Sequence, residues 1–104
     1  MFLISRGYII ENIVYLELVK RGYSVTLGKL NGSEIDFLCK KSDEVFYIQV
    51  TERIHEENKD REFNSLIKVK DAYPKYIISE DIGDKSNYGI KHINLLDFLI
   101  NFLE

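Results

Sequence analysis

The sequence has few of the residues that mark secreted, membrane-spanning or disulfide-stabilised proteins. Its 104 residues include one cysteine, one proline and no tryptophan. The single Cys39 excludes a disulfide framework and a cysteine-based zinc cluster, and it is typical of a reducing compartment. No apolar run reaches the roughly 18 residues of a membrane span, and the first residues lack the charged start and cleavage site of a secretion signal. We therefore expect a cytoplasmic protein with no membrane partner.

The composition is that of an ordinary globular protein. Hydrophobic residues make up 45% of the chain and charged residues 30%, which is close to the average for soluble domains. The formal net charge of -3 argues against nonspecific coating of nucleic acid, although it is compatible with a local basic patch. A chain of this length is expected to form one domain, residues 1–104, around a single core.

The spacing of apolar residues predicts the order α-β-β-β-α-β-β-α. Gly22 follows Lys20 and Arg21, which is typical of a helix C-terminus, Pro74 ends the second helix, and Asn94 with Asp97 resembles a helix-capping pair. The predicted elements are a helix over 7–21, strands over 23–29, 34–40 and 45–51, a helix over 60–72, strands over 75–79 and 89–93, and a last helix from 95 to the C-terminus. An antiparallel run followed by a crossover helix predicts an α/β fold with a mixed sheet and helices on both faces.

Two of the predicted strands carry polar side chains inside apolar runs. Asp36 interrupts the run Ile35-Asp36-Phe37-Leu38, while Gln49 and Thr51 lie two residues apart on the next strand and so share a face. A buried carboxylate is costly unless it has a partner or an ion. An acid on one strand beside polar residues on the next is the pattern of a metal-assisted phosphodiesterase.

This order resembles the core of the PD-(D/E)XK nuclease superfamily, which includes archaeal Holliday junction resolvases. Gly7-x-x-x-Glu11 followed by Arg21-Gly22-Tyr23-Ser24-Val25 is similar to the first helix and first strand of the resolvases. By that match Glu11 takes the helix-acid position and Asp36 the strand-two position. Gln49-Val50-Thr51 falls where the superfamily has Glu-x-Lys, so both of its informative residues depart from the pattern.

A second resemblance is to the C-terminal domain of unknown function that follows the ATPase module in many bacterial and archaeal AAA-type proteins. It rests on several spaced motifs, at 11–18, 34–37, 47–50, 61–66, 71–76 and 89–92. The resemblance implies a nuclease-like fold that has an ATPase module as its partner, in cis or in trans. The chain itself has no Gly-x-x-x-x-Gly-Lys-Ser/Thr loop and does not bind ATP in that way.

The departures at positions 49 and 51 bear on the chemistry. In a working nuclease of this kind, carboxylates at positions 36 and 49 hold Mg²⁺ or Mn²⁺, and a lysine at position 51 activates water. Gln49 removes one negative charge, and Thr51 removes the ammonium group. Asp36 and Glu11 are the remaining candidate metal ligands of a degenerate catalytic site.

Lys40 and Lys68 are the candidate replacements for the missing cation and the candidate nucleic-acid-binding residues. Two interpretations stay open. The first is a catalytically degenerate, nuclease-like accessory or interaction domain of an ATPase. The alternative is a divalent-metal-dependent DNA endonuclease with a rearranged site.

Three further expectations concern the core and the surface. Cys39 is expected in the core, and His92, beside Lys91, at the surface. The last helix is apolar almost all round over 95–103, which predicts a contact with a second copy or with another chain.

Overall fold

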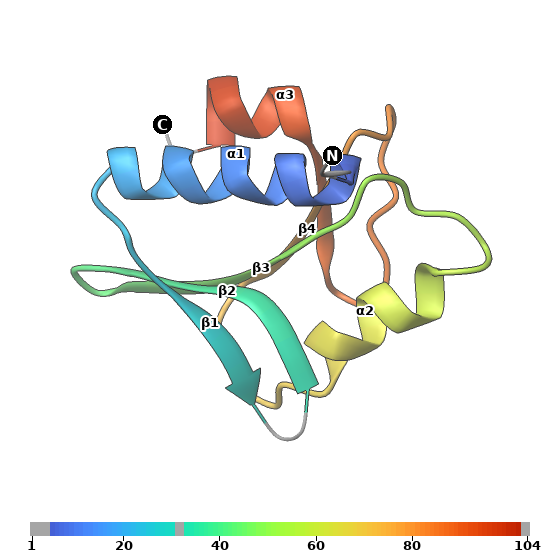
Figure 1. Ribbon diagram of the computed structural model, residues 1–104. Helices are drawn as coiled ribbons and strands as arrows, with labels where there is room; N and C mark the ends of the chain where they lie inside the picture. Colours follow the sequence, from blue (N-terminus) through green and yellow to red (C-terminus); the bar gives the residue numbers. More distant parts are fainter. Residues whose placement is uncertain (1–4, 31–32, 103–104) are drawn as a thin grey trace.

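The computed structural model describes residues 5–30 and 33–102, and it shows a small α/β domain with one five-stranded mixed sheet (Figure 1). The elements are α1 (Arg6–Lys20), β1 (Ser24–Leu30), β2 (Ser33–Lys41), β3 (Glu44–Val50), α2 (Lys59–Ile67), β4 (Lys75–Ser79), β5 (Lys91–Asn94), α3 (Leu95–Asp97) and the π-helical turn η1 (Phe98–Phe102). The strand order is β1-β2-β3-β4-β5. β1, β2 and β3 pair antiparallel, whereas β3, β4 and β5 pair parallel. The predicted α/β class and element order are confirmed.

The helices cover both faces of the sheet, as the sequence predicts (Figure 1). On one face, α1 and the segment α3–η1 pack over a core centred on Val14, Leu18, Cys39 and Ile48. On the other face, α2 packs over a second cluster that contains Phe63, Leu66 and Ile77. Cys39 is fully buried, so its expected place in the core is confirmed.

Two predicted boundaries were wrong for local reasons. The second helix ends at Ile67 and not at Ala72, because the chain turns there and the Asp71 carboxylate binds Tyr73 N–H and the Lys75 ammonium. The last strand begins at Lys91 and not at Gly89. Gly89 has φ +77°, a left-handed conformation that is turn geometry and not strand geometry.

The start of α1 is fixed by a cap. The Ser5 hydroxyl accepts a hydrogen bond from Tyr8 N–H, which satisfies one of the free donors of the first turn. Ile10, Val14 and Leu18 then follow at helical spacing and are buried against the sheet. α1 therefore lies firmly on the sheet through one narrow face.

The last helix is only partly covered. The Asn94 side chain accepts hydrogen bonds from Leu96 N–H and Asp97 N–H, so the predicted cap is present. Phe98 is fully buried, but Leu96 and Ile100 are exposed. The helix is thus partly buried and partly exposed, its contact with a second copy or another chain stays a prediction, and residues 103–104 lie outside the described range.

Candidate functional site

The candidate site forms where β2 leaves β3. The regular pairing of these strands runs from Lys41 and Glu44 to Phe37 and Ile48. Beyond this point, hydrogen bonds from side chains replace the backbone hydrogen bonds between the two strands. Asp36 N–H donates to Gln49 Oε1 at 3.1 Å, and Val50 N–H donates to Asp36 Oδ2 at 2.8 Å.

The fork is visible in Figure 1, where β2 curves away from the sheet toward α2. Opening the ladder would leave backbone groups without partners, which is costly in a partly buried place. The side chains of Asp36 and Gln49 supply those partners. Both residues therefore have a structural task that is independent of any ligand.

Both helices bring acids to this fork. From α2, Glu62 is buried, and Gln49 Nε2 donates to Glu62 Oε2 at 3.3 Å. From α1, Glu11 lies near enough that its charge acts on Asp36. We call Glu11, Asp36, Gln49 and Glu62 the fork cluster.

The fork cluster carries more negative than positive charge, because its three acids have one guanidinium beside them, that of Arg61, 3.3 Å from Glu62 Oε1. Burial raises the pKa of Asp36 to about 7, against the opposing hydrogen bond from Val50, and the charges of Glu11, Glu62 and Glu34 add to the rise. Burial also raises the pKa of Glu11, with a further contribution from Glu62. Among the described residues, every charge that acts appreciably on the Asp36 carboxyl is negative.

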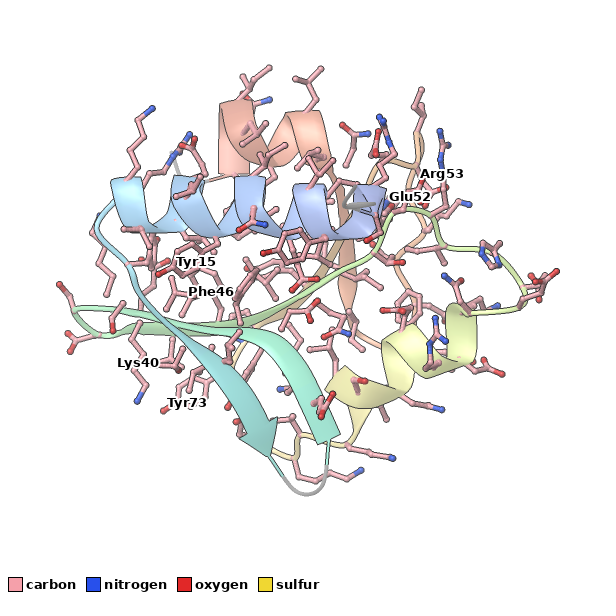
Figure 2. The ribbon with its side chains drawn as sticks, viewed as in Figure 1. Tyr15, Lys40, Phe46, Glu52, Arg53 and Tyr73 are labelled. Carbon is pink, nitrogen blue, oxygen red and sulfur yellow. The ribbon has the colours of Figure 1, made fainter. Side chains whose placement is uncertain are left out.

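The other predicted site residues lie apart from this cluster. The Thr51 hydroxyl donates to the Arg53 carbonyl at 3.4 Å and not to a member of the fork cluster. Lys40 is exposed and pairs with Val45 near the β2–β3 turn, at the opposite end of the hairpin from Asp36 (Figure 2). Lys68 is the exposed C-cap of α2. The structure thus places Glu11, Asp36 and Gln49 together and Thr51, Lys40 and Lys68 elsewhere.

In its present arrangement the fork cluster does not form a ready metal site. Within residues 5–30 and 33–102, no three His, Cys, Asp or Glu side chains are arranged to hold one. The Gln49 carbonyl oxygen and one Asp36 oxygen already accept backbone hydrogen bonds, and Gln49 donates its amide to Glu62. Mg²⁺ needs several oxygen ligands free to point at one position, and these oxygens are engaged elsewhere.

Glu62 is the member of the cluster that the sequence reasoning missed. A signal was present in the spacing. Glu62 stands four residues before Leu66 on α2 and one before Phe63, which places it on the apolar side of the helix. An acid on that side of a short helix indicates a polar contact in the core.

A second buried polar network lies at the carboxyl ends of β4 and β5. The Ser79 hydroxyl donates to Asp81 Oδ2 at 2.7 Å and contacts His92 Nε2 at 2.7 Å. Asp81 also accepts from Ile54 N–H at 2.7 Å and from Lys85 Nζ at 3.2 Å. We call Ser79, Asp81, Lys85 and His92 the β4–β5 network.

His92 is buried, so its predicted surface position was wrong. Its Nδ1 accepts a hydrogen bond from Lys85 N–H at 3.2 Å, so the neutral ring carries its proton on Nε2 and donates it to Ser79. Burial lowers the pKa of His92. The ring therefore has no free basic nitrogen near Ser79, and the three residues do not form a nucleophilic triad, in which His takes the serine proton.

A groove of about 860 Å³ lies on the sheet edge near β5, away from the fork cluster. Tyr76, Lys91, Asp97 and Phe102 are among the residues that line it. No member of the fork cluster lines this groove. The fork cluster is thus a set of contacts between strands and helices, and it does not line this groove.

Comparison with known proteins gives a relative among bacterial proteins. The chain is 41% identical over 92 residues to an uncharacterized protein of Haemophilus influenzae, and the match covers 88% of this chain and 22% of that protein. The chain thus spans about a fifth of the length of the curated relative it matches. No family model matches the chain. No solved structure matches it either.

Among the described residues, no helix is both long enough and apolar enough to cross a membrane.

Proposed function

We propose that this chain is a nuclease-like accessory domain, catalytically degenerate, that acts in the cytoplasm together with an AAA-type ATPase module. The observation that carries the proposal is the state of Gln49. This residue stands at the position of a catalytic acid in the superfamily that the sequence resembles, and it links Asp36 N–H to Glu62. A residue that closes the fork between β2 and β3 has a structural role in place of a catalytic one.

The charges around Asp36 support the loss of catalysis. Phosphodiester cleavage needs positive charge where the phosphate becomes more negative. The groups that act on Asp36 among the described residues are acids, and Thr51, at the lysine position, turns toward Arg53. The fork cluster would repel a DNA phosphate at pH 8.

The ATPase half of the proposal rests on sequence resemblance and on length. The motifs at 11–18, 34–37 and 61–66 resemble the domain that follows an ATPase module. The matched relative is a much longer protein, of which this segment is 22%. A small α/β unit within a longer chain is consistent with an accessory role.

The alternative function is a divalent-metal-dependent DNA endonuclease with a rearranged site. One observation favours it: α2 supplies Glu62 to the cluster, so a third carboxylate stands beside Asp36 and Glu11. In this reading Glu62 replaces the acid that is missing at position 49. The present side-chain arrangement does not fit the metal, so this function requires the contacts of Gln49 to rearrange.

A cleavage assay separates the two functions. The wild-type chain is incubated with branched, single-stranded and duplex DNA in Mg²⁺ or Mn²⁺, beside Asp36→Ala, Glu62→Gln and the control Asp43→Asn in the exposed β2–β3 turn. We expect no cleavage above the Asp36→Ala level. Cleavage that Asp36→Ala and Glu62→Gln abolish, and that Asp43→Asn keeps, would establish the endonuclease instead.

The ATPase association has its own test in the Haemophilus influenzae relative. The proposal predicts that the full-length relative binds and hydrolyses ATP. A purified, folded relative that neither binds nor hydrolyses ATP would contradict this half, whatever the outcome of the DNA assay.

A further inference from the structure

The loop between β4 and β5, residues 80–90, is held against β5 through one histidine. Lys85 N–H donates to His92 Nδ1 at 3.2 Å, and His92 N–H donates to Ser86 Oγ at 2.8 Å. His92 lies on β5, so both bonds join the middle of the loop to the same point of the sheet (Figure 1, where the loop is orange). The state of this one ring therefore bears on the place of the loop.

Hydrogen bonds, and not packing, hold the middle of the loop. Its two ends are buried at Asp81 and Ile90, but none of the residues 82–89 is buried. Tyr88 keeps one aromatic contact, with a ring of α2. The segment 82–87, which we call the strap, therefore depends on its hydrogen bonds, because burial contributes little there.

Lys85 attaches the strap through both its backbone and its side chain. Its N–H binds the His92 ring, while its ammonium lies 3.2 Å from Asp81 Oδ1 and donates to the Ile54 carbonyl at 2.9 Å. Both attachments require a neutral ring. In that state Nδ1 can accept a hydrogen bond, and no like charge opposes the ammonium group.

A proton added to the ring removes the first attachment. Nε2 already carries a proton and donates it to Ser79, so the added proton goes to Nδ1. The new Nδ1–H and the Lys85 N–H are then two donors 3.2 Å apart, and they repel each other. The Gly83 carbonyl is a nearby acceptor for the new N–H, but a bond to Gly83 replaces the bond to Lys85 and does not restore it.

The added charge also weakens the second attachment. Burial lowers the pKa of His92, Asp81 and Asp84 raise it, and Lys85 lowers it. The pKa values of both aspartates lie below their ordinary value, so these acids stay ionised where an imidazole titrates. Arg53 lies 4.0 Å from Asp81. A charged ring takes over part of the neutralisation of Asp81 and repels the Lys85 ammonium.

The direction of the pH effect follows from linkage. In the closed arrangement burial holds the pKa of His92 below its ordinary value of 6.5. Release of the strap uncovers the ring and removes Lys85 from it, so the open arrangement binds the proton more tightly. A proton bound more tightly by the open arrangement shifts the equilibrium toward that arrangement as the pH falls.

We propose that the strap is an acid-sensitive latch, in which protonation of His92 releases Lys85 and Ser86 from β5. β5 is the last strand of the sheet, and Ser86 Oγ is the partner of the His92 N–H. Release of the strap therefore frees a backbone donor on an edge strand, where an extended segment of another chain can pair. The latch does not depend on the proposed function, because neither the fork cluster nor an ATPase takes part in it.

A second histidine lies near the strap and must be separated from His92. His55, Glu56 and Lys59 line a hollow of about 470 Å³ together with Lys85. His55 is exposed, and it is the other of the two histidines in the sequence. His55→Gln is therefore the matched control, because it removes a titrating ring beside the same loop and leaves His92 in place.

The first experiment follows the full chain and its His55→Gln variant by NMR from about pH 4.5 to about pH 8, a range around the ordinary pKa of histidine. We expect the Lys85 and Ser86 amide resonances to move with the midpoint of the His92 ring, below pH 6.5. The amide order parameters of the strap should fall from about 0.85 to below about 0.6, the values of rigid and flexible backbone. The amides of β3 should stay rigid, and His55→Gln should give the same result.

The second experiment replaces the titrating ring. The asparagine side chain of the His92→Asn variant has an oxygen that can accept from Lys85 N–H but takes up no proton in this range, so its strap should stay ordered at pH 5. If this variant does not fold, the midpoints of the first experiment decide the question.

Several results would overturn the proposal. They are a His92 ring that stays neutral over the whole range, and a strap that stays ordered while the ring is protonated. A loop transition centred elsewhere, such as at the pKa of Asp36 of about 7, would have the same meaning. So would a transition that His55→Gln removes or His92→Asn keeps, or a loss of order across the whole domain in place of the strap.

Discussion

Two aspartates are partly or fully buried in this domain, and their surroundings differ in nearly every respect. Burial alone would raise the pKa of Asp81, but hydrogen bonds from Ile54, Ser79 and Lys85 together hold it below the ordinary value. Burial raises the pKa of Asp36 to about 7, and a single backbone hydrogen bond from Val50 does not offset it. The ionised form of Asp81 is stabilised in the folded protein, and the ionised form of Asp36 is destabilised.

The two pKa values differ because different groups surround Asp81 and Asp36. The β4–β5 network gives Asp81 an ammonium group, a hydroxyl and a backbone N–H. The fork cluster gives Asp36 two further acids and the amide of Gln49. Buried charges that are fully paired belong to structure, whereas unbalanced ones are typical of functional sites or their remnants. This contrast is why the fork cluster, and not the Ser-His-Asp set, is the candidate site.

The largest expected effect comes from removing the paired acid. Asp81→Ala leaves the buried Ile54 N–H and the Ser79 hydroxyl without their common acceptor, which should cost about 3–5 kcal/mol of unfolding free energy. Urea unfolding at pH 7 measures the loss, with Asp43→Ala as an exposed control. A loss below that of an ordinary surface substitution would mean that the β4–β5 network does not hold this part of the fold.

The unpaired acid should behave in the opposite way. The pKa of Asp36 is raised in the folded state above its ordinary value of 3.8, so the folded protein holds the proton more tightly than the unfolded chain. Stability therefore falls as the pH rises from about 4 through 7. Compared with Asp36→Asn, the wild type should lose on the order of 2–3 kcal/mol between pH 5 and pH 8.

The measurement is urea unfolding of both proteins over that range. The asparagine side chain of the Asp36→Asn variant keeps an oxygen for the Val50 N–H but has no proton to lose, so the difference between the two curves isolates the titration. Parallel curves for the two proteins would show that Asp36 ionises without cost, and the contrast with Asp81 would disappear.

A smaller effect is expected from adding one more acid to the fork cluster. Gln49→Glu keeps an oxygen for Asp36 N–H but replaces the amide donor to Glu62 by a second carboxylate. We expect a loss of about 1–2 kcal/mol at pH 8 that shrinks toward pH 5, where the acids are partly protonated. Asn64→Asp adds the same charge at an exposed position on α2 and serves as the control. A loss equal at both pH values would point to altered packing and not to charge.

Much of the fold could be predicted from local pattern. The strand Lys75–Ser79 has the predicted bounds, since Pro74 precedes it and its apolar run is short and clear. The Asn94 cap was predicted because its partners lie two and three residues along the chain. The early end of α2 was missed, because the side-chain contacts of Asp71 that form the following turn leave no mark in the apolar spacing.

The candidate site could be predicted only in part. Asp36 and Gln49 stand out as polar residues within apolar strands, and the structure brings them into direct contact. Thr51 has the same pattern, yet β3 ends at Val50 and the chain turns its hydroxyl toward Arg53. Alternation fixes the face of a side chain only while the strand continues.

The sequence by itself thus determined the order of the elements, the two-sided core and the place of Asp36 and Gln49, because these depend on periodicity and on neighbours along the chain. Only the tertiary structure decided that Glu62 joins Asp36, that His92 is buried against Ser79, and that two buried acids have opposite pKa shifts. The protonation of a carboxyl depends on the charges and donors that reach it through space. Those groups come from α1, α2 and distant strands. Contacts between residues so far apart along the chain leave no pattern in the local sequence.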